Sequence, residues 1–136
     1  MDEQVHRRTF RGEPGALAEV RRFARRALPP GRPAAADFVL LLDEVAANAV
    51  LHSDSGRPGG AFEVVIRIRP GALRAEVCDA GPPRRPGTPP PPDWSREAGR
   101  GLLLVSMLAT DWGTRRLPRG RVVWFELAGA HGLRAA

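Results

Sequence analysis

Apolar residues recur at helical spacing in residues 37–52, a segment that reads DFVLLLDEVAANAVLH and contains neither glycine nor proline. Successive residues of an α-helix lie about 100° apart, so residues three and four positions apart share a face. The face that this pattern predicts to be buried carries four apolar side chains: Phe38, Leu42, Val45 and Ala49. The rest of the chain can be organised around this helix.

A stripe of polar residues lies beside that apolar face. Glu44, Asn48 and His52 are spaced four residues apart, so they line up along the helix. Such a stripe is commonly the solvated side of an amphipathic helix. The alternative is a polar wall next to a hydrophobic floor, which suits a binding site, and both interpretations stay open for His52.

Strands and further helices follow from the same kind of pattern. Alternation of apolar and polar residues predicts strands at 62–68 and 73–77, and the turn at Pro70 and Gly71 makes them an antiparallel hairpin. Weaker patterns predict the remaining elements: a strand at 5–11, helices at 14–28 and 102–109, and strands at 114–117 and 122–127. This order predicts an α/β (α+β) fold, a two-layer sandwich with three helices on one face of a mixed, largely antiparallel sheet.

Length and composition narrow the class of protein. The 136 residues are expected to form a single domain, residues 1–136. No apolar run approaches the roughly 20 residues of a membrane span, and the N-terminus lacks the apolar core of a signal peptide, so a cytoplasmic location without membrane contact is expected. Cys78 is the single cysteine, which excludes an internal disulfide and a cysteine-built metal site.

The formal net charge of +6 raises the question of nucleic-acid binding. All 21 basic residues are arginine, as a GC-rich coding bias would produce, and they are scattered along the chain. Aromatic residues do not interleave with them as a base-stacking platform requires. The charge is therefore assigned to solubility or to an acidic protein partner. Direct contact with nucleic acid is not expected, and a basic nucleic-acid-binding domain is kept as an alternative.

Residues 82–98 differ from the rest of the chain. Half of the 14 prolines fall between Pro82 and Pro92, which excludes a helix or a central strand there. An extended loop is predicted, and a proline-rich ligand for a recognition domain is the alternative.

Three short motifs follow one another along the chain: E-x-x-x-N in the helix at 37–52, D-x-G after the strand at 73–77, and G-x-G-L at the start of the last helix. Their residues are Glu44 and Asn48, then Asp79 and Gly81, then Gly99, Gly101 and Leu102. In this order and spacing they resemble the N box and the two glycine boxes of the histidine-kinase-like ATPase (GHKL) superfamily, over residues 34–127. The resemblance implies a Bergerat-type ATP-binding fold that takes ATP or ADP with Mg²⁺.

Within that superfamily, the length of the chain and the segments GRGLLLVSMLATDWG and VVWFEL resemble the anti-sigma-factor serine/threonine kinases of bacteria. The resemblance implies a regulator of transcription that binds a sigma factor and phosphorylates a serine of an antagonist protein. Because relatives often form dimers, it also implies a homodimer. A non-catalytic, ATP-dependent protein-interaction module is the alternative from a different class.

The resemblance also gives the motif residues their roles. Asp79 would accept a hydrogen bond from the exocyclic amine of adenine, which favours ATP over GTP, and Gly81 would let the backbone approach the base. Asn48 would coordinate Mg²⁺ through its carboxamide oxygen. Glu44 would accept the proton of an attacking hydroxyl.

The second glycine box is expected to hold phosphate. Backbone N–H groups near Gly99, Gly101 and Leu102, together with the Arg100 side chain, would bind phosphate oxygens, and residues 82–98 would form the ATP lid. An ordinary turn is the alternative for each glycine motif alone.

Two departures from the family pattern predict weaker binding or slower turnover. Pro83 replaces the last glycine of the first box. Val122 replaces a threonine that relatives carry near the adenine.

Overall fold

The computed structural model describes residues 3–52, 59–80 and 99–128. Every predicted helix and strand is present within them, in the order β1 (Gln4–Arg11), α1 (Ala16–Ala27), α2 (Ala35–His52), β2 (Ala61–Arg69), β3 (Ala72–Asp79), α4 (Gly99–Leu108), β4 (Asp111–Leu117) and β5 (Gly120–Ala128). The largest differences from the prediction are at α4, which begins at Gly99 rather than at Leu102, and at β4, which begins at Asp111 rather than at Thr114.

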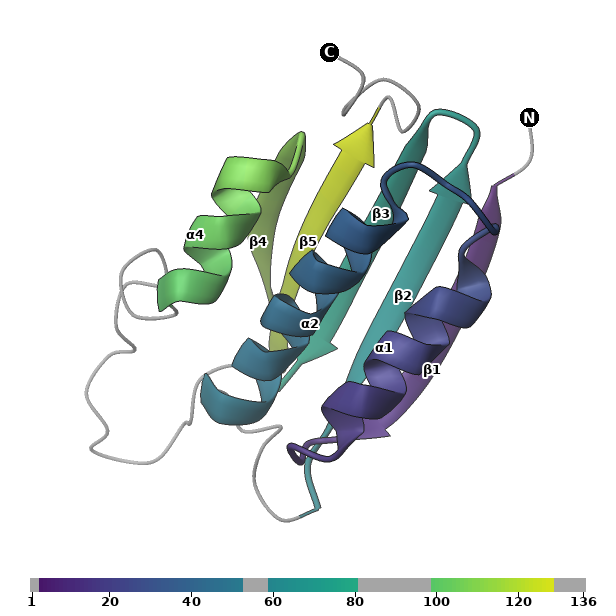
Figure 1. Ribbon diagram of the computed structural model, residues 1–136. Coiled ribbons are helices and arrows are strands. Elements are labelled where there is room, and N and C mark those ends of the chain that lie inside the picture. Colours follow the sequence, from purple (N-terminus) through teal and green to yellow (C-terminus); the bar gives the residue numbers. More distant parts are fainter. Residues whose placement is uncertain (1–2, 53–58, 81–98, 129–136) are drawn as a thin grey trace.

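The sheet has five strands in the order β1-β2-β3-β5-β4, and each neighbouring pair is antiparallel. Figure 1 shows α1, α2 and α4 on one face of this sheet, with α2 between the other two helices. The predicted two-layer α+β sandwich is confirmed, and its described strand pairs are all antiparallel rather than mixed. No helix in the described ranges has both the length and the apolar content of a membrane span.

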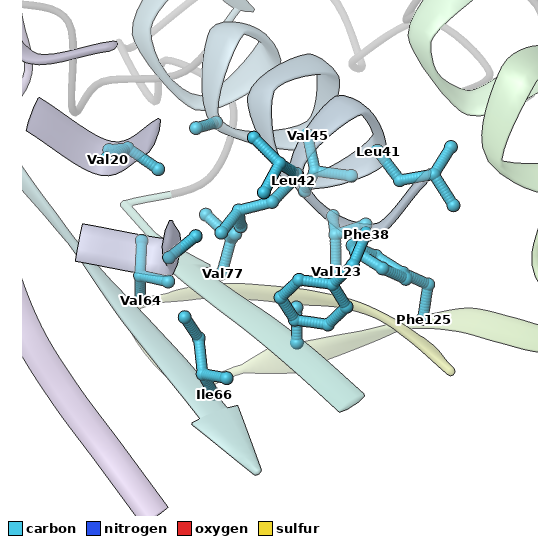
Figure 2. Close-up of a cluster of buried hydrophobic side chains, with 14 of the residues drawn as sticks. Val20, Phe38, Leu41, Leu42, Val45, Val64, Ile66, Val77, Val123 and Phe125 are labelled. Atoms are coloured by element: carbon cyan, nitrogen blue, oxygen red, sulfur yellow. The ribbon is translucent and has the colours of Figure 1, made fainter. Parts of the chain in front are cut away.

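The hydrophobic core lies between α2 and the sheet, as the helical pattern predicted. Phe38, Leu42, Val45 and Ala49 are each at most 1% exposed. Figure 2 shows side chains of α2 above those of the central strands, among them Ile66, Val77, Val123 and Phe125. The rings of Phe38 and Phe125 lie 5.3 Å apart between centroids. Each such side chain contributes about 1.5–3 kcal/mol on burial, so α2 is held firmly on the sheet.

The opposite face of the sheet, called here the open face, carries charged residues. Arg74 donates hydrogen bonds to Glu76 at 2.8 Å and to Glu126 at 2.9 Å, and its guanidinium lies 4.2 Å from the ring centroid of Trp124. Val65 also lies on this face yet is 1% exposed, although its position in the alternation predicted an outward side chain. Its register partners are Arg7 and Glu76, and the apolar stems of such long side chains shield a small residue between them.

Candidate functional site

The stripe of polar residues on α2 is not exposed to solvent along its whole length, because Asn48 is buried. This side chain is buried, with 7% of the residue exposed, and its Nδ2 has no hydrogen-bond partner in the described part of the chain. A buried donor without a partner costs about 1–3 kcal/mol, so native proteins rarely keep one unless a ligand or water completes it. Glu44 lies one turn earlier and is half-buried. His52 ends α2, and its side chain lies outside the described part.

Asp79 is the last residue of β3 and faces the helices. The β3–β5 register places Arg121 directly opposite it. Arg121 Nη2 donates a hydrogen bond to Asp79 Oδ2 at 3.0 Å, and the two side chains are 4% and 2% exposed. The position is therefore a strand end with a buried ion pair, and Asp79 does not act merely as a turn former.

Burial governs the ionisation of this pair. Desolvation lowers the pKa of the Arg121 guanidinium, and the neighbouring Asp79 carboxylate only partly offsets this. Guanidinium keeps its proton in proteins even so, because its ordinary pKa is far above neutral. The site thus contains a fixed positive charge beside the carboxylate that was expected to face adenine.

A backbone contact fixes the start of β5 against the end of β3. A Cβ added at Gly120 would lie 2.2 Å from the carbonyl oxygen of Asp79, so only glycine fits there. Gly120 and Arg121 were not predicted as site residues from the sequence. The alternation of the strand indicates on which face each of these residues lies. Which residue of the neighbouring strand lies opposite it depends on the register, which the sequence does not give.

The expectation for Val122 is wrong. Its register partner is Cys78, and both side chains point to the open face, away from Asp79. A substitution at Val122 therefore cannot remove a hydroxyl from the site. The position that faces Asp79 is occupied by Arg121.

The three motifs gather at one end of the molecule. The C-terminal end of α2, the end of β3 and the beginning of α4 all lie at the lower end in Figure 1. Gly99, Arg100, Gly101 and Leu102 form the first turn of α4, and helix α4 packs beside α2. The first-turn N–H groups of a helix have no partner within the helix, so they are available to an anion.

Several predicted features of the site cannot be placed. The side chains of Arg100 and Leu102 lie outside the described part of the chain, and so do Gly81, Pro83 and the whole of residues 82–98.

The donor set at this end fits a magnesium ion held mainly by a ligand. No group of three or more His, Cys, Asp or Glu side chains in the described residues could enclose a metal. Mg²⁺ usually keeps several waters and is held by one or two protein oxygens together with substrate phosphates. The carboxamide oxygen of Asn48 is one protein oxygen of the kind that such a site uses, whereas its Nδ2, which has no partner in the described part of the chain, is a donor that suits a phosphate oxygen or a water.

A groove of about 510 Å³ lies elsewhere, between α1 and the N-terminal half of α2. Arg21 Nη1 donates to Asp43 Oδ1 across it at 2.7 Å. Apolar residues also line it, including Leu28, Val39 and Leu40. This groove is separated from Asn48 along α2, so it is not part of the site built by the three motifs.

Comparison with known proteins agrees with this geometry. Residues 10–127 match the protein family described as "Histidine kinase-like ATPase domain". No curated protein matches the chain. The matched residues include Glu44, Asn48, Asp79 and the first turn of α4.

Proposed function

Because the chain belongs to the family of histidine kinase-like ATPase domains, we propose that it binds ATP and ADP with Mg²⁺ and acts as an anti-sigma-type regulator. In this role it binds a sigma factor and transfers phosphate from ATP to a serine of an antagonist protein. Both partners are carried over from the resemblance of the sequence to that branch of the family.

The observation that carries the proposal is the buried carboxamide of Asn48. Its Nδ2 has no partner in the described part of the chain and lies one turn from Glu44, on a helix whose C-terminal end lies at the same end of the molecule as the end of β3 and the start of α4. An acid, an amide and a helix N-terminus at one end of a sheet are the groups that a phosphate-bearing nucleotide requires. Burying the Asn48 Nδ2 donor without a described partner costs free energy of folding, and a ligand that accepts a hydrogen bond from it would offset that cost.

The chemistry follows from the side chains. Asn48 would hold Mg²⁺ by its carboxamide oxygen, and the bound ion supplies neutralisation of the phosphate charge. First-turn N–H groups of α4 would orient the phosphates. Glu44 would accept the proton of the attacking serine hydroxyl, since its carboxylate is one helical turn from Asn48 and half-buried.

The distribution of exposed arginines on the surface is also consistent with binding to a protein partner. Arg22, Arg25 and Arg26 are exposed on α1, where they offer positive charge to an acidic protein surface. Nucleic-acid binding is disfavoured, because many arginines already pair with carboxylates. Those with such a pair include Arg7, Arg8, Arg21, Arg67, Arg69, Arg74 and Arg121.

The second candidate is a module that binds nucleotide and partner without turnover. It is favoured by Pro83, which stands where the resemblance predicts a glycine. Proline fixes φ and removes a backbone donor, so a phosphate-covering loop would lose conformational freedom at that point.

Two measurements separate the candidates. Calorimetric titration with ATP and ADP, with and without Mg²⁺, is expected to show Mg²⁺-dependent binding that Asn48→Ala weakens at least tenfold. Transfer of labelled phosphate from ATP to a candidate antagonist is expected to stop in Glu44→Gln. Glu19→Gln, a half-exposed acid on α1, serves as the control and is expected to change neither.

Each result has a clear meaning. Binding without transfer in the wild type would remove the kinase claim and leave the module. No binding of either nucleotide would remove both candidates.

A further inference from the structure

The groove between α1 and the N-terminal half of α2 offers an apolar surface to solvent. Leu28 and Val39 line it and are 6% and 8% exposed, whereas Leu40, which also lines it, is 43% exposed. An exposed leucine that continues an apolar groove forms a contiguous apolar surface, and such surfaces mark sites that bind another molecule.

Positive charge lies along one side of this groove. Arg21 and Arg25 line it one turn apart on α1, and the charge of Arg21 is paired with Asp43 at 2.7 Å. Arg25 makes no ion pair in the described part of the chain, and it is exposed together with Arg22 and Arg26 on the same helix. The first turn of α2 also lines the groove and adds the positive end of a helix dipole. Carboxylates are therefore the groups that this side of the groove attracts.

The walls of the groove are held in place without a partner. The connection from α1 to α2 contains Pro29, Pro30 and Pro33, whose rings fix their φ angles. Arg32 lies in the same connection and donates a hydrogen bond to the carbonyl oxygen of Arg69 at 2.6 Å, which ties the connection to the end of β2. A preformed groove loses little conformational entropy when a partner binds to it.

We propose that this groove binds an acidic, amphipathic helical segment of a partner protein. Apolar side chains of that segment occupy the space lined by Leu28, Val39 and Leu40, and its carboxylates lie against Arg25 and the arginines next to it. The inference deepens the proposed function, on which it rests for the existence of a protein partner, and it names the surface and the chemistry of that contact.

Two other occupants fit the groove less well. A second copy of the chain brings the same net charge of +6 to a basic surface, so the charges oppose self-association. A nucleic acid is attracted by the charge, but its phosphate backbone has no apolar group for the space between the helices.

The position of the groove keeps the partner away from the nucleotide. The groove lies beside the connection between α1 and α2, at the upper end in Figure 1, whereas the three motifs gather at the lower end. A helix bound in the groove therefore leaves that lower end accessible.

The test is a fluorescence anisotropy titration of the whole chain with designed helical peptides, in the absence of nucleotide. The acidic peptide carries leucines on one helical face and glutamates on the other. One control peptide has lysines in place of the glutamates, and a second has serines in place of the leucines. The acidic peptide is expected to bind at least about tenfold more tightly than either control, because it alone supplies both the apolar anchor and the opposite charge. Changes in NMR amide shifts are expected to fall within residues 21–43.

Two matched pairs of variants locate the binding. Arg25→Glu is expected to weaken it about tenfold, whereas Arg115→Glu, at an exposed arginine of β4, is expected to leave it unchanged. Leu40→Ser is expected to weaken it by about the same factor, whereas Val5→Ser, at a side chain with the same 43% exposure on β1, is expected to have no effect. Circular dichroism checks that each variant is folded.

The outcomes separate this inference from the proposed function. Absence of acidic-peptide binding, equal binding of the lysine peptide, or binding that neither Arg25→Glu nor Leu40→Ser weakens overturns the inference. Self-association that Leu40→Ser abolishes assigns the groove to a second copy and overturns it too. If a groove variant does not fold, the three peptides on the wild type decide the matter.

Calorimetric titration with ATP and Mg²⁺ is expected to give the same affinity in the groove variants as in the wild type. Absence of ATP binding from the wild type overturns the proposed function instead. The peptide titrations contain no nucleotide, so they still decide what the groove binds.

Discussion

The two faces of the sheet use arginine–carboxylate pairs in opposite surroundings. On the helix-covered face, Asp79 and Arg121 are 2% and 4% exposed and stand beside an apolar core. On the open face, the side chains of Arg74 and Glu76 are 21% and 19% exposed and belong to a wider network with Arg67 and Glu126. The first pair is shielded from solvent, while the second is partly exposed within its network.

This difference changes the sign of the electrostatic effect on arginine. Burial acts to lower the pKa of Arg74, but hydrogen bonds to Glu76 and Glu126 outweigh it, so the pKa of Arg74 is raised. For Arg121 burial wins against Asp79, and the pKa is lowered. On the open face, the attraction between arginine and glutamate outweighs the cost of removing the charges from water, so the pair stabilises the fold. In the buried pair, the cost of desolvation is larger than the attraction, so stability alone does not explain why the pair is present.

The largest expected effect comes from breaking the buried pair. Asp79→Leu or Arg121→Met alone is expected to lower the free energy of unfolding by about 3–5 kcal/mol, because the remaining charge is left buried without its partner. The double variant is expected to recover most of that loss. Urea unfolding followed by circular dichroism measures all three, and single variants that cost less than about 1 kcal/mol would show that the pair is solvated.

The second effect tests whether Asn48 is kept for a ligand. Asn48→Leu removes a buried donor without a described partner, so stability is expected to stay constant or to rise by up to about 1–3 kcal/mol. Nucleotide binding is expected to fall at least tenfold. Leu51→Ala, at an exposed position one turn on, is the control for changes in α2. A large loss of stability in Asn48→Leu would indicate a structural role for the amide.

The third effect concerns the open face and its response to pH. Burial acts to raise the pKa of Glu76, but hydrogen bonds and charges from Arg74 and Arg67 lower it below its ordinary range. The stability that Glu76 contributes is therefore present above about pH 4.3, the ordinary pKa of a glutamate, and is lost as the pH falls through the lower folded-state pKa.

Glu76→Gln is accordingly expected to flatten the decline of stability on the acid side of that pH. At neutral pH it is expected to cost less than about 1 kcal/mol, because the network is partly exposed. Thermal unfolding measured from about pH 3 to about pH 7, a range that spans the ordinary pKa of a glutamate, detects both effects. An identical acid limb in the variant would show that Glu76 titrates normally.

The smallest effect is expected at an exposed pair. Arg8 Nη2 donates to Glu19 Oε1 at 3.1 Å, and both side chains are nearly half exposed. Glu19→Ala is expected to change the free energy of unfolding by no more than about 0.5 kcal/mol, since such pairs gain little in water. A clear loss would mean that exposure does not separate the two kinds of pair in this protein.

Local patterns were sufficient to predict most of the fold. Period-two alternation identified β2 and β3, and the apolar face of α2 around Phe38 and Val45 was correct, because both signals lie within a few residues. The start of α4 was placed too late, since the glycines of the segment suggested a turn and packing beside α2 overrides that propensity.

The site depended on information that the chain does not carry locally. Asn48 is buried because α2 lies between two helices over the sheet, and a helical wheel of α2 alone cannot show its neighbours. Arg121 faces Asp79 through a register between strands 42 residues apart. The expectation for Val122 came from the resemblance to relatives alone, and a one-residue difference in position along a strand moves a side chain to the other face of the sheet.

The strand order has a further consequence for how this chain can be divided. β3 and β5 are neighbours in the sheet, yet α4 and β4 are inserted between them in the sequence. A cut between residues 80 and 99 would therefore yield two fragments, each with one newly unpaired strand edge, that of β3 or of β5, and one uncovered apolar surface that the other fragment complements. Mixed together, the fragments should rebuild the sheet along a single seam, and the protein would serve as a split reporter whose reassembly restores the paired ends of β3 and β5.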